Sequence, residues 1–218
     1  MKIFIDTAIT EEIKEAAALG IIKGVTTNPS LMAKSGRTLN DVITEILTIV
    51  DGPISAEVEE SDWESMYNQA HEIVKMTNNN PNITIKLPMT TDGVRTCSML
   101  SKEGIKTNVT LIFSVSQAVL AMEAGATFIS PFMGRVDDYL PNEVTPGAKL
   151  IQDIKAVKDI YGYKSEIIAA SIRHRGHVEQ AAMAGADIAT IPFKVIKDMY
   201  IHDLTTRGLK IFADASKK

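Results

Sequence analysis

The sequence predicts an α/β fold, a single (β/α)8 barrel of the TIM type with an extra C-terminal helix. Short β-rich runs alternate strictly with longer amphipathic runs, which indicates parallel strands joined by right-handed crossovers. There are eight such strand-like runs, the number that closes a barrel, and 218 residues fall at the compact end of the range for this fold. No linker, low-complexity segment or charge block divides the chain.

The expected strands are short and rich in β-branched residues, and in chain order they are Lys2–Asp6, Gly24–Asn28, Ile54–Val58, Ile83–Leu87, Thr107–Leu111, Thr127–Pro131, Glu166–Ala170 and Asp187–Ile191. The expected helices repeat apolar residues at helical spacing, and they are Glu11–Leu19, Leu39–Val50, Trp63–Met76, Val94–Glu103, Ser116–Ala124, Ala148–Tyr161, His177–Ala184 and Val195–Tyr200. Ser61 and Asp62 give a start signal before Trp63. Gly125 and Gly185, each within an Ala-Gly-Ala repeat, mark helix ends that lead directly into strands.

Two segments do not follow the alternation. Residues Asp137–Thr145 form a polar, proline-containing stretch that predicts an irregular loop after the sixth strand. Residues 204–218 are expected to form a surface helix left over once the barrel is complete. The same elements would also fit an open, doubly wound sheet, which is the alternative architecture.

Composition excludes several classes of protein. The formal net charge is −4, with 23 Lys and Arg against 27 Asp and Glu, and no basic block is present. This weighs against a general partner role for nucleic acid or a membrane surface, although a local cationic pocket for a small anion remains compatible. The only cysteine, Cys97, cannot form an internal disulfide, which suits a reducing cytoplasm.

Polar residues gather on one face of the strands near their carboxyl ends. Side chains alternate between the two faces of a strand, so Asp6 shares a face with Phe4, and Lys86 shares a face with Thr84. Applied to the other strands, the same rule places these residues on the matching faces: Thr26 with Asn28, Ser55 with Glu57, Asn108 with Thr110, and Ser130 with Phe132. For any single residue, a strand end facing water is an equally good explanation. All of them together match the carboxyl-terminal mouth of a barrel, where barrel enzymes keep their active sites.

These residues favour carbonyl chemistry. Lys86 lies in an otherwise apolar strand, and a partly buried lysine amine can attack a carbonyl to form a Schiff base, an electron sink that allows a neighbouring carbon–carbon bond to break. Asp6 and Glu57 are the carboxyl groups available to move protons, and Thr110 could hold a water between them and the lysine. Asn28, Asn108 and Ser171 could bind the hydroxyls of a polyol. Arg135 and Arg173 follow the sixth and seventh strands, where barrels often hold phosphate, although surface ion pairs would explain them equally well.

Other constellations are weak. His174 and His177 are three residues apart but have no cysteine or acidic companions at ligand spacing, so no metal site is expected. The chain contains neither a G-x-G-x-x-G fingerprint nor a P-loop.

Five motifs in order resemble those of the transaldolase family, in the short bacterial and archaeal subgroup that also contains the fructose 6-phosphate aldolases. They are GVTTNPS at 24–30, ITIKLP at 83–88, NVTLIFS at 108–114, SPFMGR at 130–135 and AASIR at 169–173. The similarity runs from Lys2 to about Leu209. It implies a class I aldolase-type barrel over residues 1–218, with 204–218 as a helix that contacts other copies in a homo-oligomer, a pentamer or decamer.

The resemblance also implies roles for the site residues. Lys86 would form the Schiff base, Asp6 would act as the acid/base in breaking the C3–C4 bond, and Glu57 and Thr110 would handle the catalytic water. The dihydroxyacetone unit would contact Thr26, Asn28, Asn108 and Ser171, and the substrate phosphate would contact Ser130, Arg135 and Arg173. The implied reaction transfers dihydroxyacetone from sedoheptulose 7-phosphate to glyceraldehyde 3-phosphate in the pentose phosphate pathway, with no cofactor or metal.

Two positions separate the activities of this subgroup. Transaldolases resemble one another in carrying Glu and Phe where this chain has Glu57 and Phe132, whereas the fructose 6-phosphate aldolases carry Gln and Tyr. The chain therefore resembles the transferases, and an aldolase that releases free dihydroxyacetone is the alternative. A catalytically silent scaffold would not need Lys86, Asp6 and Glu57 together, and a phosphate-binding barrel isomerase would not need the strand lysine.

Overall fold

The computed structural model describes residues 1–217, and within them eight parallel strands close into a barrel in chain order, each hydrogen-bonded to the next and β8 to β1. The strands are β1 Lys2–Asp6, β2 Ile22–Thr26, β3 Ile54–Glu57, β4 Ile83–Pro88, β5 Thr107–Ile112, β6 Phe128–Pro131, β7 Glu166–Ala169 and β8 Ile188–Ile191. The barrel prediction is therefore confirmed, and the open sheet is wrong. Each expected strand agrees with the structure to within two residues at either end.

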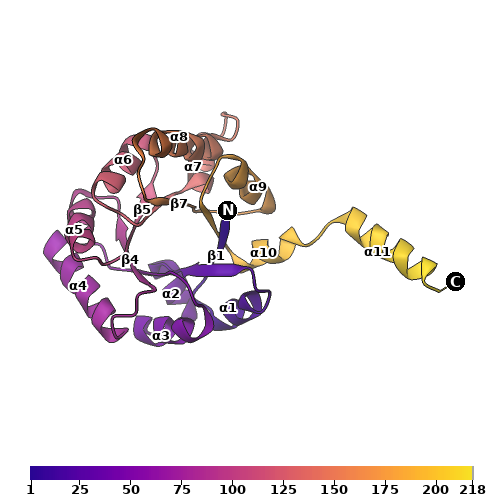
Figure 1. Cartoon of the computed structure of the whole chain (residues 1–218), viewed down its shortest axis with the longest axis horizontal. Helices are drawn as coiled ribbons and strands as arrows, with labels where there is room; N and C mark the ends of the chain where they lie inside the picture. Colours follow the sequence, from indigo (N-terminus) through magenta and orange to yellow (C-terminus); the bar gives the residue numbers. More distant parts are fainter. Residues whose placement is uncertain (218) are drawn as a thin grey trace.

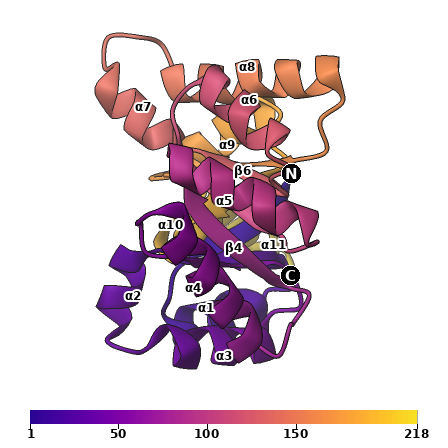
Figure 2. The ribbon, with the colours of Figure 1, turned by 90° about the vertical axis from the view of Figure 1, so that its left-hand side faces the viewer.

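Helices surround the barrel, with the exception of α11, which lies apart from it (Figure 1). In chain order they are α1 Thr10–Ala17, α2 Pro29–Ser35, α3 Leu39–Ile49, α4 Trp63–Met76, α5 Thr91–Lys102, α6 Val115–Glu123, α7 Met133–Tyr139, α8 Pro146–Tyr161, α9 Arg175–Met183, α10 Phe193–Met199 and α11 Asp203–Ala215. From the side, β4 runs obliquely behind α4 and α5 (Figure 2). No helix within residues 1–217 combines the length and apolar character needed to cross a bilayer.

Local signals explain where several helices begin and end. Asp62 accepts a hydrogen bond from the Ser65 backbone N–H (3.0 Å) and so caps α4 at the predicted position. Gly125 and Gly185 have φ of +84° and +85°, the left-handed conformation that only glycine adopts without strain, and each ends a helix just before a strand.

The sequence analysis missed two short helices, α2 and α7. Each has seven residues, too few for apolar periodicity to identify. The start of α2 does carry a local signal, because Asn28 accepts a hydrogen bond from the Leu31 backbone N–H and Pro29 occupies the first helical position. The segment expected to be irregular, Asp137–Thr145, actually begins inside α7.

The two faces of the strands contribute to two separate apolar clusters. The outward faces pack with the helices and are apolar, as with Ile5, Ile54 and Ile85, all completely buried. A second cluster fills the barrel interior and consists of Phe4, Phe128, Ile168 and Ile188. Gly24 makes room for this cluster, because a Cβ at that position would come within 2.6 Å of the Phe4 ring. The interior is thus packed, which leaves the carboxyl-terminal mouth for a site.

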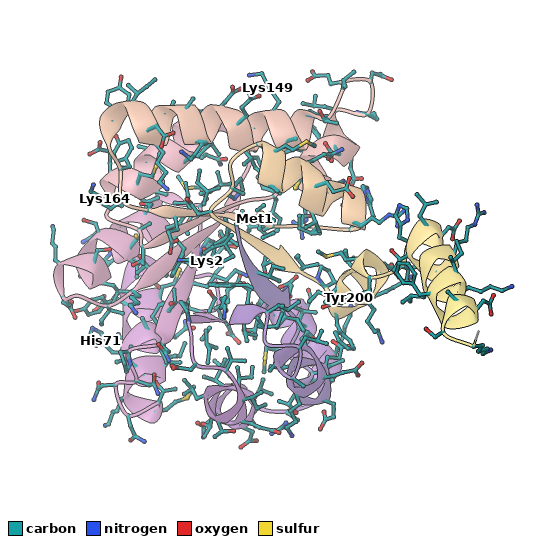
Figure 3. The ribbon with its side chains drawn as sticks, turned by 45° about the vertical axis from the view of Figure 1, so that its right-hand side comes forward. Met1, Lys2, His71, Lys149, Lys164 and Tyr200 are labelled. Atoms are coloured by element: carbon teal, nitrogen blue, oxygen red, sulfur yellow. The ribbon has the colours of Figure 1, made fainter. Side chains whose placement is uncertain are left out.

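Helix α11 lies apart from the barrel (Figures 1 and 3). None of its residues is buried, and Leu204, Leu209, Ile211 and Phe212 are each at least 63% exposed. The predicted C-terminal helix is confirmed through Ala215, and Lys218 lies outside the described residues. Exposed apolar side chains on an amphipathic helix are typical of a surface that another protein chain covers.

Candidate active site

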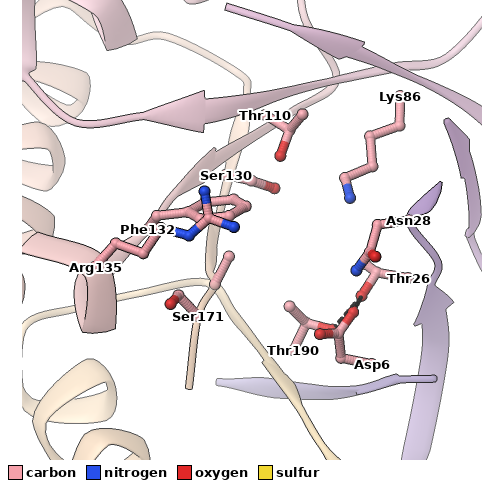
Figure 4. A pocket seen from close by; sticks show the side chains of 11 residues that line it. Asp6, Thr26, Asn28, Lys86, Thr110, Ser130, Phe132, Arg135, Ser171 and Thr190 are labelled. Atoms are coloured by element: carbon pink, nitrogen blue, oxygen red, sulfur yellow. Dashed lines mark hydrogen bonds between the residues drawn. The ribbon is translucent and has the colours of Figure 1, made fainter. Parts of the chain in front are cut away.

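A pocket opens at the carboxyl ends of the strands (Figure 4). Its volume is about 180 Å³. It is continuous with a more open cavity of about 420 Å³, which shares Asn28, Lys86, Thr110, Phe132 and Arg135 with it and also reaches Glu57. The pocket lining comes from seven of the eight strands or the residues that follow them, and from α7: Asp6, Thr26, Asn28, Lys86, Thr110, Ser130, Phe132, Arg135, Ala170, Ser171 and Thr190. Nine of the twelve residues predicted from the sequence therefore line one pocket.

Lys86 is the buried cation of the site. It is 5% exposed, and its Nζ donates a hydrogen bond to the carbonyl oxygen of Thr27 (2.9 Å). Glu57 Oε2 lies 2.8 Å from the same nitrogen, in an ion pair without the direction of a good hydrogen bond. The two side chains face each other because their residues are register partners on β3 and β4. An amine and a carboxylate are thus in contact at the base of the mouth.

Asp6 lies on β1, in the part of the pocket wall that also carries Thr26 and Thr190 (Figure 4). Thr26 donates a hydrogen bond to Asp6 Oδ1 (2.7 Å), and the Thr26 hydroxyl also lies 2.6 Å from that of Thr190. Burial raises the pKa of Asp6, while Lys86 and the bond from Thr26 oppose the rise and Glu57 adds to it. A raised pKa makes the Asp6 carboxylate a stronger base than an ordinary one, which suits a group that takes up and returns a proton.

Asn108 and Ser130 belong to a hydrogen-bonded row inside the barrel. Asn108 Nδ2 donates to Ser55 Oγ (3.1 Å), and Ser130 Oγ donates to Asn108 Oδ1 (2.7 Å). Asn108 is fully buried and is not part of the pocket lining. Thr110, on the same strand, does line the pocket, and its buried Oγ1 has no hydrogen-bond partner among residues 1–217. That hydroxyl is available to a ligand.

Arg135 lies at the rim on α7. Its guanidinium lies over the Phe132 ring, 5.0 Å from the ring centre, and Phe113 meets that ring edge-on with 5.8 Å between centres. Figure 4 shows both Arg135 and Phe132 reaching into the pocket from the wall opposite Lys86. One wall of the mouth therefore combines an apolar ring with a cation.

The structure places Arg173 outside the pocket lining. Its guanidinium forms a two-pronged ion pair with Asp138, and both side chains are well exposed to solvent. An exposed ion pair contributes only about 0–1 kcal/mol to stability, so an anion such as phosphate can compete with Asp138. Ser171, two residues earlier, lines the pocket and has φ of +60°, a left-handed conformation that costs a serine energy.

Sequence reasoning missed Thr190. It lies on β8, where it shares the inward face with Ile188, so the alternation rule that identified Asp6 would also have found it. Within the described part of the chain, no three His, Cys, Asp or Glu side chains are arranged to hold a metal ion.

The comparisons with known proteins identify the family of the chain. The family model for transaldolase/fructose-6-phosphate aldolase matches residues 3–218. A relative named "Probable transaldolase" from Carboxydothermus hydrogenoformans is 56% identical over 212 residues, covering 97% of this chain and 96% of its own. Another of the same name, from Geotalea uraniireducens, is 53% identical over 218 residues, covering 100% and 99%.

A solved structure described as a lactate oxidase of Pediococcus acidilactici shares the fold, with a TM-score of 0.58 at 14% identity. The match covers 88% of this chain and 62% of that one, so this chain spans less than two thirds of that protein. At this identity the likeness concerns the fold alone. The family model matches nearly the whole chain, and the two relatives are 56% and 53% identical to it. The chain therefore belongs to the transaldolase/fructose-6-phosphate aldolase family.

Proposed function

We propose that the protein is a transaldolase that transfers a dihydroxyacetone unit from sedoheptulose 7-phosphate to glyceraldehyde 3-phosphate, giving erythrose 4-phosphate and fructose 6-phosphate. The observation that carries the proposal is the buried Lys86 amine, 2.8 Å from the Glu57 carboxylate, in one small pocket with Asp6. A nucleophilic amine with an adjacent base is what Schiff-base formation requires.

The reaction begins with Lys86. Glu57 accepts a proton from the Nζ ammonium, and the neutral amine attacks the C2 carbonyl of the ketose. The resulting carbinolamine loses water to give an iminium, with Glu57 returning its proton to the departing hydroxyl. The Thr110 hydroxyl, buried and unpartnered within residues 1–217, supports a role in holding this water.

Asp6 then acts on the bound sugar. Its carboxylate takes the proton of the C4 hydroxyl, the C3–C4 bond breaks, and the bonding electrons pass to the iminium nitrogen to form an enamine. The aldehyde product leaves, and the enamine carbon attacks the acceptor aldehyde, whose oxygen receives the proton from Asp6. The raised pKa of Asp6 supports both directions of proton transfer. Hydrolysis of the new iminium by water frees Lys86.

The remaining residues bind the substrate. We assign the dihydroxyacetone hydroxyls to Thr26, Asn28 and Ser171, with the buried Asn108 orienting the Ser130 hydroxyl in the pocket wall. We assign the phosphate to Arg135 and Arg173 at the rim, because guanidinium groups match phosphate in charge and geometry. Arg173 would exchange Asp138 for the phosphate.

An aldolase that releases dihydroxyacetone is the second candidate. Release requires a proton at the enamine carbon, and the Phe132 ring in the pocket wall offers none, which favours transfer. A coupled assay distinguishes the two. With fructose 6-phosphate as donor, we expect glyceraldehyde 3-phosphate to appear only when erythrose 4-phosphate is present. Release at a comparable rate without an acceptor would replace the transaldolase assignment with the aldolase one.

We also propose that the enzyme is a cytoplasmic homo-oligomer of the pentose phosphate pathway, in which α11 contacts a neighbouring copy. The exposed Leu209, Ile211 and Phe212 on that helix support the contact. Light scattering should give the mass of a pentamer or decamer for the whole chain. A chain ending at Ile201 should be a smaller species, and a monomeric whole chain would refute the proposal.

A further inference from the structure

Behind the loop that carries Ser171 and Arg173, a buried histidine meets a half-buried aspartate, and the proposed reaction uses neither of them. His177, on α9, is only 5% exposed. Asp137, on α7, is its partner, with 3.1 Å between His177 Nε2 and Asp137 Oδ2.

The contacts of His177 fix its tautomer. The backbone N–H of Arg173 donates a hydrogen bond to His177 Nδ1 (3.3 Å), so that nitrogen must be an acceptor. In a neutral imidazole the proton then lies on Nε2, where it points at Asp137. Asp137 in turn accepts a hydrogen bond at Oδ1 from the backbone N–H of Gly147 (2.9 Å), at the start of α8. The imidazole thus connects the Arg173 loop to α7 and α8.

This loop needs external support. Ser171 is in a left-handed conformation, which a serine adopts only when its surroundings enforce it. The loop also packs closely on α7, because a Cβ at Gly134 would lie 2.2 Å from the Ser171 carbonyl oxygen and 3.1 Å from Arg173 Nε. Arg135 follows Gly134 directly. The two arginines assigned to phosphate are therefore held by one packed junction, and His177 lies at its centre.

We propose that His177 is a positioning residue for phosphate recognition: its Nδ1 fixes the backbone at Arg173, and its Nε2–H to Asp137 fixes that loop to the helix that carries Arg135. This inference rests on the proposed function, because it assumes that Arg173 binds the substrate phosphate. His177 touches no substrate. It acts only through the placement of the guanidinium.

Charged and titratable groups of both signs surround the imidazole. They are Arg173 on the loop, Asp137 and Asp138 on α7, and His174, whose ring centre is 3.8 Å from that of His177. Burial lowers the pKa of His177, and His174 and Arg173 lower it further, while Asp137 and the Ser171 backbone oppose the shift. A neutral ring keeps Nδ1 free to accept the Arg173 N–H, and protonation would remove that acceptor.

Two conservative variants separate the two contacts. Asparagine places its Oδ1 near the position of Nδ1, and glutamine places its amide NH₂ near that of Nε2. Each is assayed with glyceraldehyde 3-phosphate and with unphosphorylated glyceraldehyde as acceptor. Each variant keeps one contact and loses the other, so we expect both His177→Gln and His177→Asn to raise KM for the phosphorylated acceptor about five- to tenfold, the effect of roughly one hydrogen bond. Neither variant should change kcat or the KM for glyceraldehyde.

Arg173→Ala serves as the matched control, because it removes the guanidinium but keeps the backbone N–H. It should raise KM for the phosphorylated acceptor alone, and adding His177→Gln should then have no further effect. The positioning role is wrong if Arg173→Ala raises KM for the phosphorylated acceptor alone but His177→Gln does not. It is also wrong if His177→Gln raises that KM further when Arg173 is already alanine. In both cases the proposed function stands. If Arg173→Ala affects both acceptors equally, both the phosphate assignment and the positioning role fall.

A measurement on the wild-type protein does not depend on any variant folding. In ¹⁵N-labelled protein at pH 7, the imidazole nitrogen shifts of His177 should show a protonated Nε2 and an unprotonated Nδ1. A proton on Nδ1 would exclude the bond from Arg173 and overturn the inference.

Discussion

Lys86 Nζ and Glu57 Oε2 lie 2.8 Å apart at the base of the barrel mouth, as an ion pair between register partners on adjacent strands. Lys86 is nearly buried, and the Glu57 side chain is 15% exposed. Removing one partner of a buried pair leaves the other charge uncompensated, which costs more than the intact pair contributes. The two residues are therefore coupled in stability as well as in chemistry.

Lys86→Met should abolish activity and also lower the free energy of unfolding. Breaking a fully buried pair costs about 3–5 kcal/mol, and we expect about 2–3 kcal/mol here because Glu57 keeps some exposure. Adding Glu57→Gln, which removes the unpaired charge, should recover most of that loss. Urea denaturation of the wild type, Lys86→Met and the double variant checks this, and a double variant no more stable than Lys86→Met would show that the pair is not coupled.

Asp6→Asn should be inactive yet more stable than the wild type at neutral pH. The folded state raises the pKa of Asp6 above its ordinary value of 3.8, so the carboxyl group contributes stability only while protonated. That contribution is complete below about 3.8 and is lost as pH rises through the folded-state pKa. Asparagine keeps an oxygen that can accept the hydrogen bond from Thr26 but carries no charge.

The stability difference between Asp6→Asn and the wild type should therefore grow as pH rises from about 3.8. Thermal unfolding across that range measures it. A difference that shrinks with rising pH would mean that the site stabilises the Asp6 carboxylate instead.

The alternation of side chains along strands was enough to identify Asp6, Glu57 and Lys86, because barrel closure converts a shared strand face into a shared pocket. The placement of Arg173 was not predictable in this way. Arg173 follows a strand, but the direction of its side chain depends on the ion pair with Asp138. Asp138 lies on α7, a helix too short for the sequence pattern to predict.

The environment of His177 was equally hidden. In the sequence it is a histidine at the start of an amphipathic stretch, and nothing local connects it to Asp137, which is 40 positions earlier. Such contacts arise from the packing of separate helices, and the periodicity of a single sequence does not predict which helices pack together.

Arg135→Ala should weaken binding of phosphorylated sugars selectively. The guanidinium lies at the rim over Phe132, and no ion pair holds it elsewhere within residues 1–217. Loss of one charge-assisted contact costs about 1.5–3 kcal/mol, or roughly ten- to a hundredfold in KM. Kinetics with glyceraldehyde 3-phosphate and glyceraldehyde provide the comparison, and equal effects on the two acceptors would remove the phosphate role of Arg135.

Phe132→Tyr should shift the enzyme from transfer toward release. The ring lines the pocket, and tyrosine adds one hydroxyl, a proton donor, at nearly constant shape. We expect more glyceraldehyde 3-phosphate from fructose 6-phosphate in the absence of an acceptor. Phe132→Leu is the control, since it changes the ring without adding a donor, and equal release by both variants would assign the effect to lost packing.

The most direct test of the Schiff-base mechanism is chemical trapping at Lys86. The wild-type protein is treated with borohydride in the presence of fructose 6-phosphate, digested and analysed by peptide mass spectrometry. A three-carbon adduct derived from dihydroxyacetone should appear on Lys86, the amine that lies between Thr27 and Glu57 in the pocket. An unchanged mass, or an adduct on Lys106 with Lys86 unmodified, would contradict the mechanism.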